Sequence, residues 1–275
     1  IGYREAMSLS KQPKKMIVVG SGAIGVEFAY FYNSLGTEVT IVEYLPSLVP
    51  LEDHEISKEL EKSFKKKGIK VLTSTEVTSI NTKGKGVKAT VKTKKGDEVI
   101  SADVLLSATG IKSNIEDIGL EDVGIAIDKD KVLVDSYYQT NIPGYYAIGD
   151  IVPGPALAHV ASAEGILCVE KISGHDVAPI DYGNIPGCTY CSPEISSVGL
   201  TEKQAIDKGF DIKIKLLDES FYRPNLAIGI RDLAGTGLLS SEYIVASKKF
   251  KQVDFSLGVG WGILSGDQNI NNPLI

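Results

Sequence analysis

Short apolar runs alternate with amphipathic segments through the first part of the chain. Residues 16–19 form a continuous apolar run that ends at a glycine, which is typical of a buried parallel strand. In residues 23–35 apolar side chains recur at spacings of four and three, which predicts a helix that stops at Gly36. These recurring side chains are Ile24, Phe28, Phe31 and Leu35. The β-branched run 39–43 predicts a second strand, which completes a strand-helix-strand unit.

The pattern then changes from this unit to shorter strands. A second amphipathic helix is expected over 56–67 and a buried strand over 69–72. Alternating strands at 77–80, 87–91 and 98–101, separated by Lys-Gly turns, predict an antiparallel meander before a last buried strand at 104–106. We therefore predict an α/β fold with a doubly wound parallel sheet and an antiparallel meander, ending as a domain of residues 1–113.

The remainder of the chain divides into two further predicted units. In residues 114–183 we expect loops, a strand at 145–148 and a helix over 156–172 that Gly174 ends. The stretch 179–187 carries prolines and glycines and reads as a linker, so we place a boundary near Asn184. Residues 184–275 then form a third unit.

Composition and charge narrow the classes of partner. The 275 residues carry a net charge of -6, which disfavours nucleic acid and anionic membranes, and a small-molecule partner fits better. Apolar runs are too short to span a bilayer, so we expect no membrane segment. Three cysteines are too few for a secreted disulfide framework, which favours a reducing, cytoplasmic location.

The first predicted strand leads into a glycine-rich loop with the dinucleotide fingerprint. The loop reads Gly20-Ser21-Gly22-Ala23-Ile24-Gly25 and opens the predicted helix. In this fingerprint Gly20 permits the tight turn and Gly22 lets the backbone approach a pyrophosphate, while Gly25 permits close packing of helix and strand. The helix N-terminus attracts the phosphate charge.

An acidic residue ends the second predicted strand at the expected distance. Glu43 can accept hydrogen bonds from ribose hydroxyls and would repel a 2′-phosphate, and no arginine lies between Gly25 and Glu43. NAD is therefore favoured over NADP. The alternative is a plain glycine turn with Glu43 as a solvated strand end, but the agreement of strand, glycines, helix and acid favours nucleotide binding.

Several motifs in a fixed order resemble the pyridine nucleotide-disulfide oxidoreductase family. They are Gly-x-Gly-x-x-Gly-x-Glu ending at Glu27, the meander, Ala108-Thr109-Gly110 and Tyr146-Ala147-Ile148-Gly149-Asp150. Leu157-Ala158-His159 with Glu164-Gly165, and Cys188 to Glu194, resemble the dihydrolipoamide dehydrogenases within it. The resemblance covers residues 1–217.

The resemblance implies FAD as a second cofactor. It makes residues 114–183 the segment that returns to complete an FAD domain, and residues 184–275 the start of an α+β interface domain. It implies that Gly149 and Asp150 hold the flavin's ribityl chain and that Leu157, Ala158 and His159 face its ring. The alternative for Asp150 is helix capping near Pro153.

Two further positions in the first domain take roles from the resemblance. Glu27 would lie beside the nicotinamide, and its alternative is a first-turn acid that the helix dipole stabilises. Gly110, which ends the last predicted strand, would contact NAD. Ile111 follows it where many relatives carry arginine, which removes one cofactor contact.

The resemblance also implies an activity and partners. Electrons would pass from dihydrolipoamide on lipoyl domains, through a disulfide that this chain lacks and FAD, to NAD. The partners would be the other subunits of a 2-oxo acid dehydrogenase complex and a second copy, as a homodimer. The alternatives are another flavin disulfide reductase, of the glutathione or mercuric reductase kind, and an NAD-binding fragment without turnover.

The sequence also departs from the family. Cys188 and Cys191 form a C-x-x-C in a strand-like stretch without further zinc-spaced ligands, so we interpret them as structural and expect no metal. No histidine follows His175, so the family's C-terminal proton acceptor is absent and we assign no catalytic residue. The tail beyond Leu217 resembles neither the interface domain nor a nucleotide loop, and reads as a divergent extension or a shifted reading frame.

Overall fold

The computed structural model forms two compact units, Ile1–Gly199 and Leu200–Ile275. The structure describes residues 1–208, 212–217, 224–231, 241–250 and 253–262. The last part of the tail, after residue 262, therefore lies outside the described residues.

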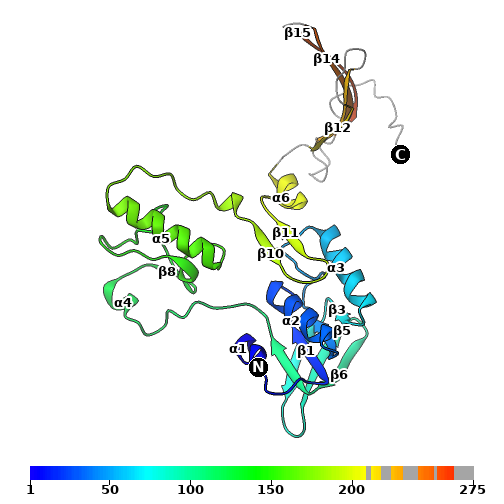
Figure 1. Ribbon diagram of the computed structural model, residues 1–275, viewed down its shortest axis with the longest axis vertical. Helices are drawn as coiled ribbons and strands as arrows, with labels where there is room; N and C mark the ends of the chain where they lie inside the picture. Colours follow the sequence, from blue (N-terminus) through cyan, green and yellow to red (C-terminus); the bar gives the residue numbers. More distant parts are fainter. Residues whose placement is uncertain (209–211, 218–223, 232–240, 251–252, 263–275) are drawn as a thin grey trace. The chain divides into compact units, whose positions relative to one another are not determined.

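The first unit contains a parallel sheet, to which the strands labelled β1 and β3 in Figure 1 belong. Its four strands lie in the order β3-β2-β1-β7. Its strands are β1 (Lys15–Val19), β2 (Glu38–Val42), β3 (Lys70–Leu72) and β7 (Val104–Ser107). The connecting helices are α2 (Ala23–Ser34) and α3 (His54–Lys66), and α1 (Tyr3–Met7) precedes β1. The predicted parallel sheet is confirmed, and Gly36 has the left-handed backbone, at φ +92°, expected of a helix stop.

Alternate residues of β1 face two different layers of the first unit. Met16 and Val18 pack with Phe64 of α3 in one buried cluster, while Ile17 packs with Val91 in a second cluster beneath the meander. The meander strands are β4 (Glu76–Asn81), β5 (Val87–Thr93) and β6 (Gly96–Ala102). A strand buried on both faces explains the unbroken apolar run that predicted it.

The helix α2 forms where the sequence predicts it but buries a different face. The side chains of Phe31 and Leu35 are 53% exposed, whereas Val26 and Ala29 are fully buried against the sheet. The small residues allow the helix to approach β1 closely, so they, and not the large apolar residues, define the packing face.

The second half of the first unit has little regular structure. It contains α4 (Leu120–Val123), the short strands β8 (Ile127–Asp128) and β9 (Lys131–Val132), the 3-10 turns η1 (Gly149–Ile151) and η2 (Tyr182–Asn184), and α5 (Ala158–Ile172). The predicted strand at 145–148 is wrong. Tyr146 makes one isolated bridge with Gln139, and the N–H of Ala147 donates to the carbonyl of Tyr138, so this backbone bonds within a local turn.

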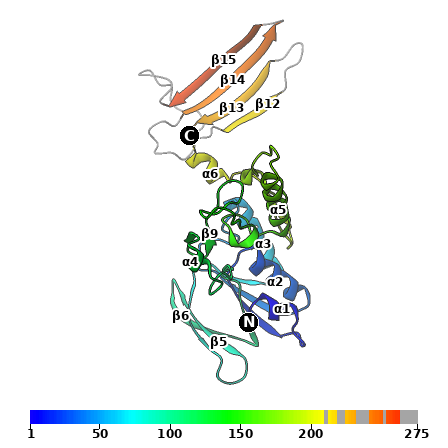
Figure 2. The ribbon, with the colours of Figure 1, turned by 90° about the vertical axis from the view of Figure 1, so that its left-hand side faces the viewer.

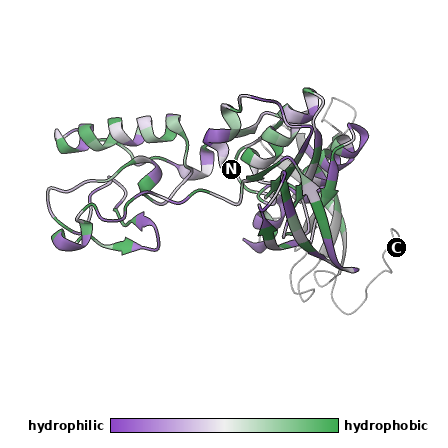
Figure 3. Cartoon of the chain, turned by 90° about the horizontal axis from the view of Figure 1, so that it is seen from below, coloured by the Kyte–Doolittle hydropathy of each residue, from purple (hydrophilic) through white to green (hydrophobic). Residues whose placement is uncertain are grey.

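The helix α5 carries apolar side chains on more than one face. Val160 and Leu167 are buried, but Ile166 and Val169 are each 62% exposed. Green, hydrophobic residues recur along the helix in Figure 3. A helix that is apolar on opposite faces is typical of one packed on both sides.

A short hairpin ends the first unit. Its strands are β10 (Gly187–Thr189) and β11 (Ile195–Ser197), and Cys191 and Ile195 pack into the same cluster as Met16.

The second unit begins with α6 (Glu202–Asp207), which Thr201 and Gln204 cap reciprocally. An antiparallel sheet of β12 (Ile212–Leu217), β13 (Asn225–Arg231), β14 (Ser241–Phe250) and β15 (Val253–Gly262) follows, in sequence order (Figure 2).

Candidate functional site

A cavity of about 880 Å³ opens at the carboxyl ends of β1 and β2. Seven of the predicted site residues line it: Gly20, Ser21, Gly22, Ala23, Ile24, Glu43 and Gly110. Side chains that the sequence reasoning did not single out also line it, including Tyr44, Leu45, Thr75 and Val77. Their position directly after β2 and β3 was the available signal, because ligands of open α/β sheets bind at the carboxyl ends of strands.

The three glycines of the fingerprint have three different surroundings. Gly20 adopts φ +95°, and a Cβ there would lie 2.4 Å from the carbonyl oxygen of Ala108. A Cβ on Gly25 would lie 2.1 Å from the carbonyl oxygen of Gly20, so the helix meets the loop backbone directly. A Cβ on Gly22 would meet nothing within 4 Å. The structure therefore closes the loop at Gly20 and Gly25 and leaves open space at Gly22.

The first turn of α2 leaves positive backbone dipoles facing this space. Gly22 is the N-cap, no side chain caps the helix, and its first turn contains no acidic residue. The first N–H groups of a helix have no partner within the helix, and together they favour an anionic group. An open N-terminus of a 12-residue helix is suited to a phosphate.

Glu43 is buried and already hydrogen-bonded. Its Oε2 accepts from the backbone N–H of Ser21 at 2.8 Å and from the Ser21 hydroxyl at 2.7 Å, and Oε1 accepts from the N–H of Leu45 at 2.7 Å. The side chain is only 6% exposed, so the solvated-strand-end alternative is wrong. A carboxylate offers about four acceptor positions, so about one is left for a ligand hydroxyl.

Glu27 lies outside this cavity and beside another. It faces a hollow of about 640 Å³ whose other lining residues include Phe28, Phe31 and Tyr190. Its Oε1 accepts a hydrogen bond from the backbone N–H of Tyr190 at 2.7 Å. The first turn of α2 holds no acid, so the first-turn alternative for Glu27 is wrong.

The return segment presents its own group of predicted residues. Gly149 adopts φ +75° and opens η1, and the following Asp150 is exposed. Leu157 is the N-cap of α5, which has neither a capping side chain nor an acid in its first turn. Because α5 begins at Ala158, Asp150 does not cap it, and the capping alternative is wrong. His159 is exposed on the first turn.

The cysteines of the C-x-x-C differ in environment. Both are free thiols, Cys188 being exposed and Cys191 buried in the main core. Burial, together with the nearby carboxylates of Glu27 and Glu194, raises the pKa of Cys191 to about 11, so its reactive thiolate is disfavoured. His54 and His175 are both exposed.

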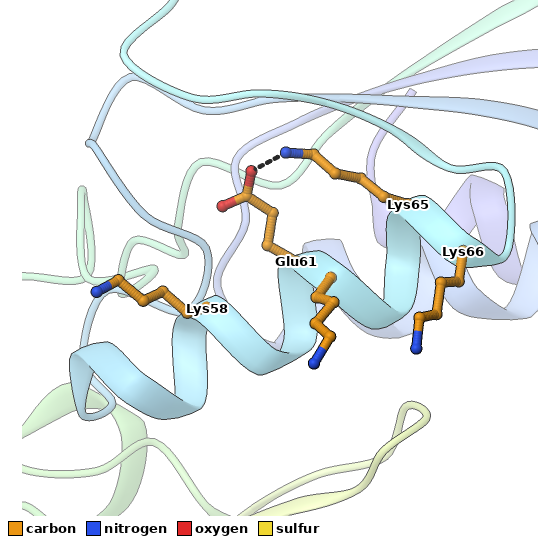
Figure 4. Close-up of a pocket in the computed structure, with 5 residues that line it drawn as sticks. Lys58, Glu61, Lys65 and Lys66 are labelled. Atoms are coloured by element: carbon orange, nitrogen blue, oxygen red, sulfur yellow. Dashed lines mark hydrogen bonds and ion pairs between the residues drawn. The ribbon is translucent and has the colours of Figure 1, made fainter.

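A separate surface hollow of about 570 Å³ lies over α3 and is lined by charged residues (Figure 4). They are Lys58, Glu61, Lys62, Lys65 and Lys66. Lys65 bonds to Glu61 one turn earlier at 2.5 Å, and Lys62 bonds to Glu59 at 3.3 Å. Such pairs are typical of a solvated helix face, and we assign no site here.

The geometry defines a dinucleotide-binding α/β domain. The family model for pyridine nucleotide-disulphide oxidoreductases matches residues 1–165, which is more than half of the chain. The chain belongs to this family.

Relatives point to one branch of the family. Dihydrolipoyl dehydrogenase of Rhizobium etli is 47% identical over 214 residues, covering 77% of this chain and 44% of the relative. The mitochondrial dihydrolipoyl dehydrogenase of Pisum sativum is 41% identical, covering 76% and 42%. The crystal structure of LpdA from Mycobacterium tuberculosis superposes with a TM-score of 0.71 at 26% identity, covering 90% of this chain and 55% of that one. The chain thus spans about half the length of the relatives that it matches.

The end of the chain matches a different family. A model described as exopolysaccharide biosynthesis protein YbjH covers residues 178–275. This range includes the whole tail beyond Leu217, for which sequence reasoning found no function. In the part of the chain that the structure describes, no helix is long and apolar enough to cross a membrane.

Proposed function

We propose that the cavity at β1 and β2 binds NAD, with its pyrophosphate over Gly22. The observation that carries the proposal is the open space at Gly22, the N-cap residue of α2, where no side chain caps the helix. By contrast, Gly20 and Gly25 pack closely against backbone carbonyl oxygens. Negative charge on the pyrophosphate would meet the first N–H groups of the helix. The remaining acceptor position of Glu43 would take one ribose hydroxyl, and a 2′-phosphate there would face a buried carboxylate.

The return segment would contribute to FAD binding. The exposed carboxylate of Asp150 suits the hydroxyls of a ribityl chain, and the uncapped start of α5 at Leu157, Ala158 and His159 suits a ring that becomes negatively charged on reduction. When bound, FAD supplies two-electron transfer between a dithiol and the nicotinamide ring. Glu27 would take its place beside the nicotinamide only if that ring extends beyond this cavity toward the hollow at Tyr190 that Glu27 lines.

The overall reaction would be oxidation of dihydrolipoamide with NAD as the electron acceptor. Relatives named dihydrolipoyl dehydrogenase, at 41% and 47% identity, support this choice within the family. We propose lipoyl domains of a 2-oxo acid dehydrogenase complex as the source of the dithiol, a homodimer as the assembly and the cytoplasm as the location. Buried Glu43 disfavours an NADPH-dependent disulfide reductase.

In the first experiment, the 275-residue chain is titrated separately with NAD and with NADP, and calorimetry measures the binding. We expect NAD to bind and NADP to bind at least tenfold more weakly. Equal affinities for the two nucleotides would count against the NAD assignment. Lipoamide reduction by the complete native polypeptide, beside the chain alone, separates an enzyme from a binding fragment.

A second candidate function concerns residues 178–275, which comprise the end of the first unit and the whole of the second. The match of residues 178–275 to exopolysaccharide biosynthesis proteins supports a module unrelated to electron transfer. The first unit has its own buried clusters, so removal of residues 200–275 should leave NAD affinity unchanged within about twofold. Peptide mapping of the native polypeptide across Gly199 and Leu200 would determine whether one chain carries both units.

A further inference from the structure

The helix α5 carries a buried carboxylate, Glu164, to which neither the NAD proposal nor the FAD proposal assigns a role. Glu164 is 1% exposed, although an uncompensated buried charge is costly. Its Oε2 accepts a hydrogen bond from the backbone N–H of Gly149 at 2.6 Å, and its Oε1 accepts one from the Tyr182 hydroxyl at 2.5 Å. Glu164 therefore joins α5, η1 and η2, three elements that are separate in the sequence.

The hydrogen bonds of this cluster have a defined direction. The single O–H of Tyr182 donates to Glu164, so in its 3.0 Å contact with Tyr138 the Tyr182 oxygen is the acceptor. Burial raises the pKa of both tyrosines above the usual range, so both hydroxyls stay protonated donors. The donor chain therefore runs from Tyr138 to Tyr182 and ends at Glu164, which also accepts from the N–H of Gly149.

The turn at Gly149 and Asp150 is held on both sides. Glu164 accepts from the N–H of Gly149, and the carbonyl of Asp150 accepts from the Ser113 hydroxyl at 2.7 Å and from Lys131 Nζ at 2.6 Å. Gly149 needs its left-handed backbone, and a Cβ there would approach Ala161 to 3.3 Å. The backbone of Asp150 is thus fixed while its side chain remains exposed.

We propose that Glu164 and Tyr182 are positioning residues, which hold the Gly149–Asp150 turn so that the Asp150 carboxylate faces a polyol chain of the bound cofactor. This inference rests on the proposed FAD role of Asp150. Glu164 does not touch the cofactor itself, because it is buried and both its oxygens bond within the protein. Its hydrogen bonds restrict the conformation of the Gly149–Asp150 turn before the ligand binds.

The test uses Tyr182→Phe in the complete native polypeptide, with two readouts. Hydrogen exchange at the Gly149 amide should accelerate about tenfold, as expected for loss of one hydrogen bond to a charged group. FAD affinity, measured by flavin fluorescence, should fall about tenfold. The matched control is Tyr137→Phe, which removes a hydroxyl that bonds to Val177 at 3.3 Å and leaves both readouts unchanged.

A double-mutant cycle separates positioning from general stability. If Tyr182 acts through Asp150, the effects of Tyr182→Phe and Asp150→Asn on FAD affinity are not additive. Additive effects, or unchanged exchange at Gly149, would overturn the inference while leaving the proposed function intact. Failure of the unaltered polypeptide to bind FAD would overturn the FAD role of Asp150 and this inference with it.

Discussion

The carboxylate of Glu43 accepts two hydrogen bonds from Ser21, one from the backbone N–H at 2.8 Å and one from the hydroxyl at 2.7 Å. The residue proposed to recognise the ribose therefore also ties the fingerprint loop to the end of β2. A substitution of Glu43 would therefore change both the selectivity between nucleotides and the shape of the loop.

Glu43→Gln tests this double role. The amide keeps one oxygen acceptor but loses the charge, so we expect NAD affinity to fall about tenfold and the preference for NAD over NADP to shrink. Calorimetric titration with both nucleotides measures the change. Ser21→Ala is the control, because it removes only the hydroxyl bond and should leave the preference between the two nucleotides unchanged.

Gly22→Ala and Gly25→Ala form a matched pair of single-methyl substitutions. The Gly22 methyl would enter open space, so the protein should keep its stability within about 0.5 kcal/mol while losing NAD affinity to the obstructing methyl. The Gly25 methyl would lie 2.1 Å from the Gly20 carbonyl oxygen, and we expect a loss of about 3 kcal/mol or more. Denaturant unfolding and NAD titration separate the two; equal stability losses would contradict the geometry.

The two thiols of the C-x-x-C should react at different rates. Exposed Cys188 should be alkylated by iodoacetamide at pH 8 well before Cys191, which is buried and has a pKa of about 11. At pH 8 the thiolate fraction of Cys191 is on the order of 0.001. Peptide mass mapping checks the order, with the denatured chain as control. Equal rates in the folded chain would reopen a redox role for the pair.

Asp103 gives a prediction for acid stability. Its Oδ2 accepts from the backbone N–H groups of Lys14 and Lys15, at 2.7 and 3.0 Å, and these bonds lower the pKa of the carboxyl. A lowered folded pKa means that the stabilisation is present above the ordinary pKa and is lost as the pH falls through the folded value. Asp103→Asn should therefore flatten the loss of thermal stability below about pH 4. Asp97→Asn, at the opposite end of β6, is the control for net charge.

The parallel sheet could be predicted because its central strand β1 is buried on both faces and therefore has an unbroken apolar run. The packing face of α2 could not be read from large residues alone, since Ile24 and Phe31 have the right spacing but lie exposed. The spacing of Gly25 and Ala29, four residues apart, was the available signal for close approach to the sheet.

The candidate site was partly predictable for a similar reason. The fingerprint residues are contiguous and Glu43 follows at a fixed interval, so the sequence alone indicates that they lie close together. Glu164 gave no such signal, because its partners Gly149 and Tyr182 reach it only through the fold. The incorrect prediction of a strand at 145–148 has the same cause, because a segment forms a strand only where a neighbouring segment supplies the hydrogen bonds.

The contact between Gly25 and the Gly20 carbonyl has a consequence for how cofactor choice could evolve. The shape of the loop requires the absence of side chains at these two positions, whereas the preference among nucleotides is proposed to depend on Glu43 at the end of β2. Exchange of one nucleotide for another could leave the glycines untouched, provided that the replacement for Glu43 still bonds to Ser21. The glycines would then be inherited unchanged by lineages whose electron carriers differ.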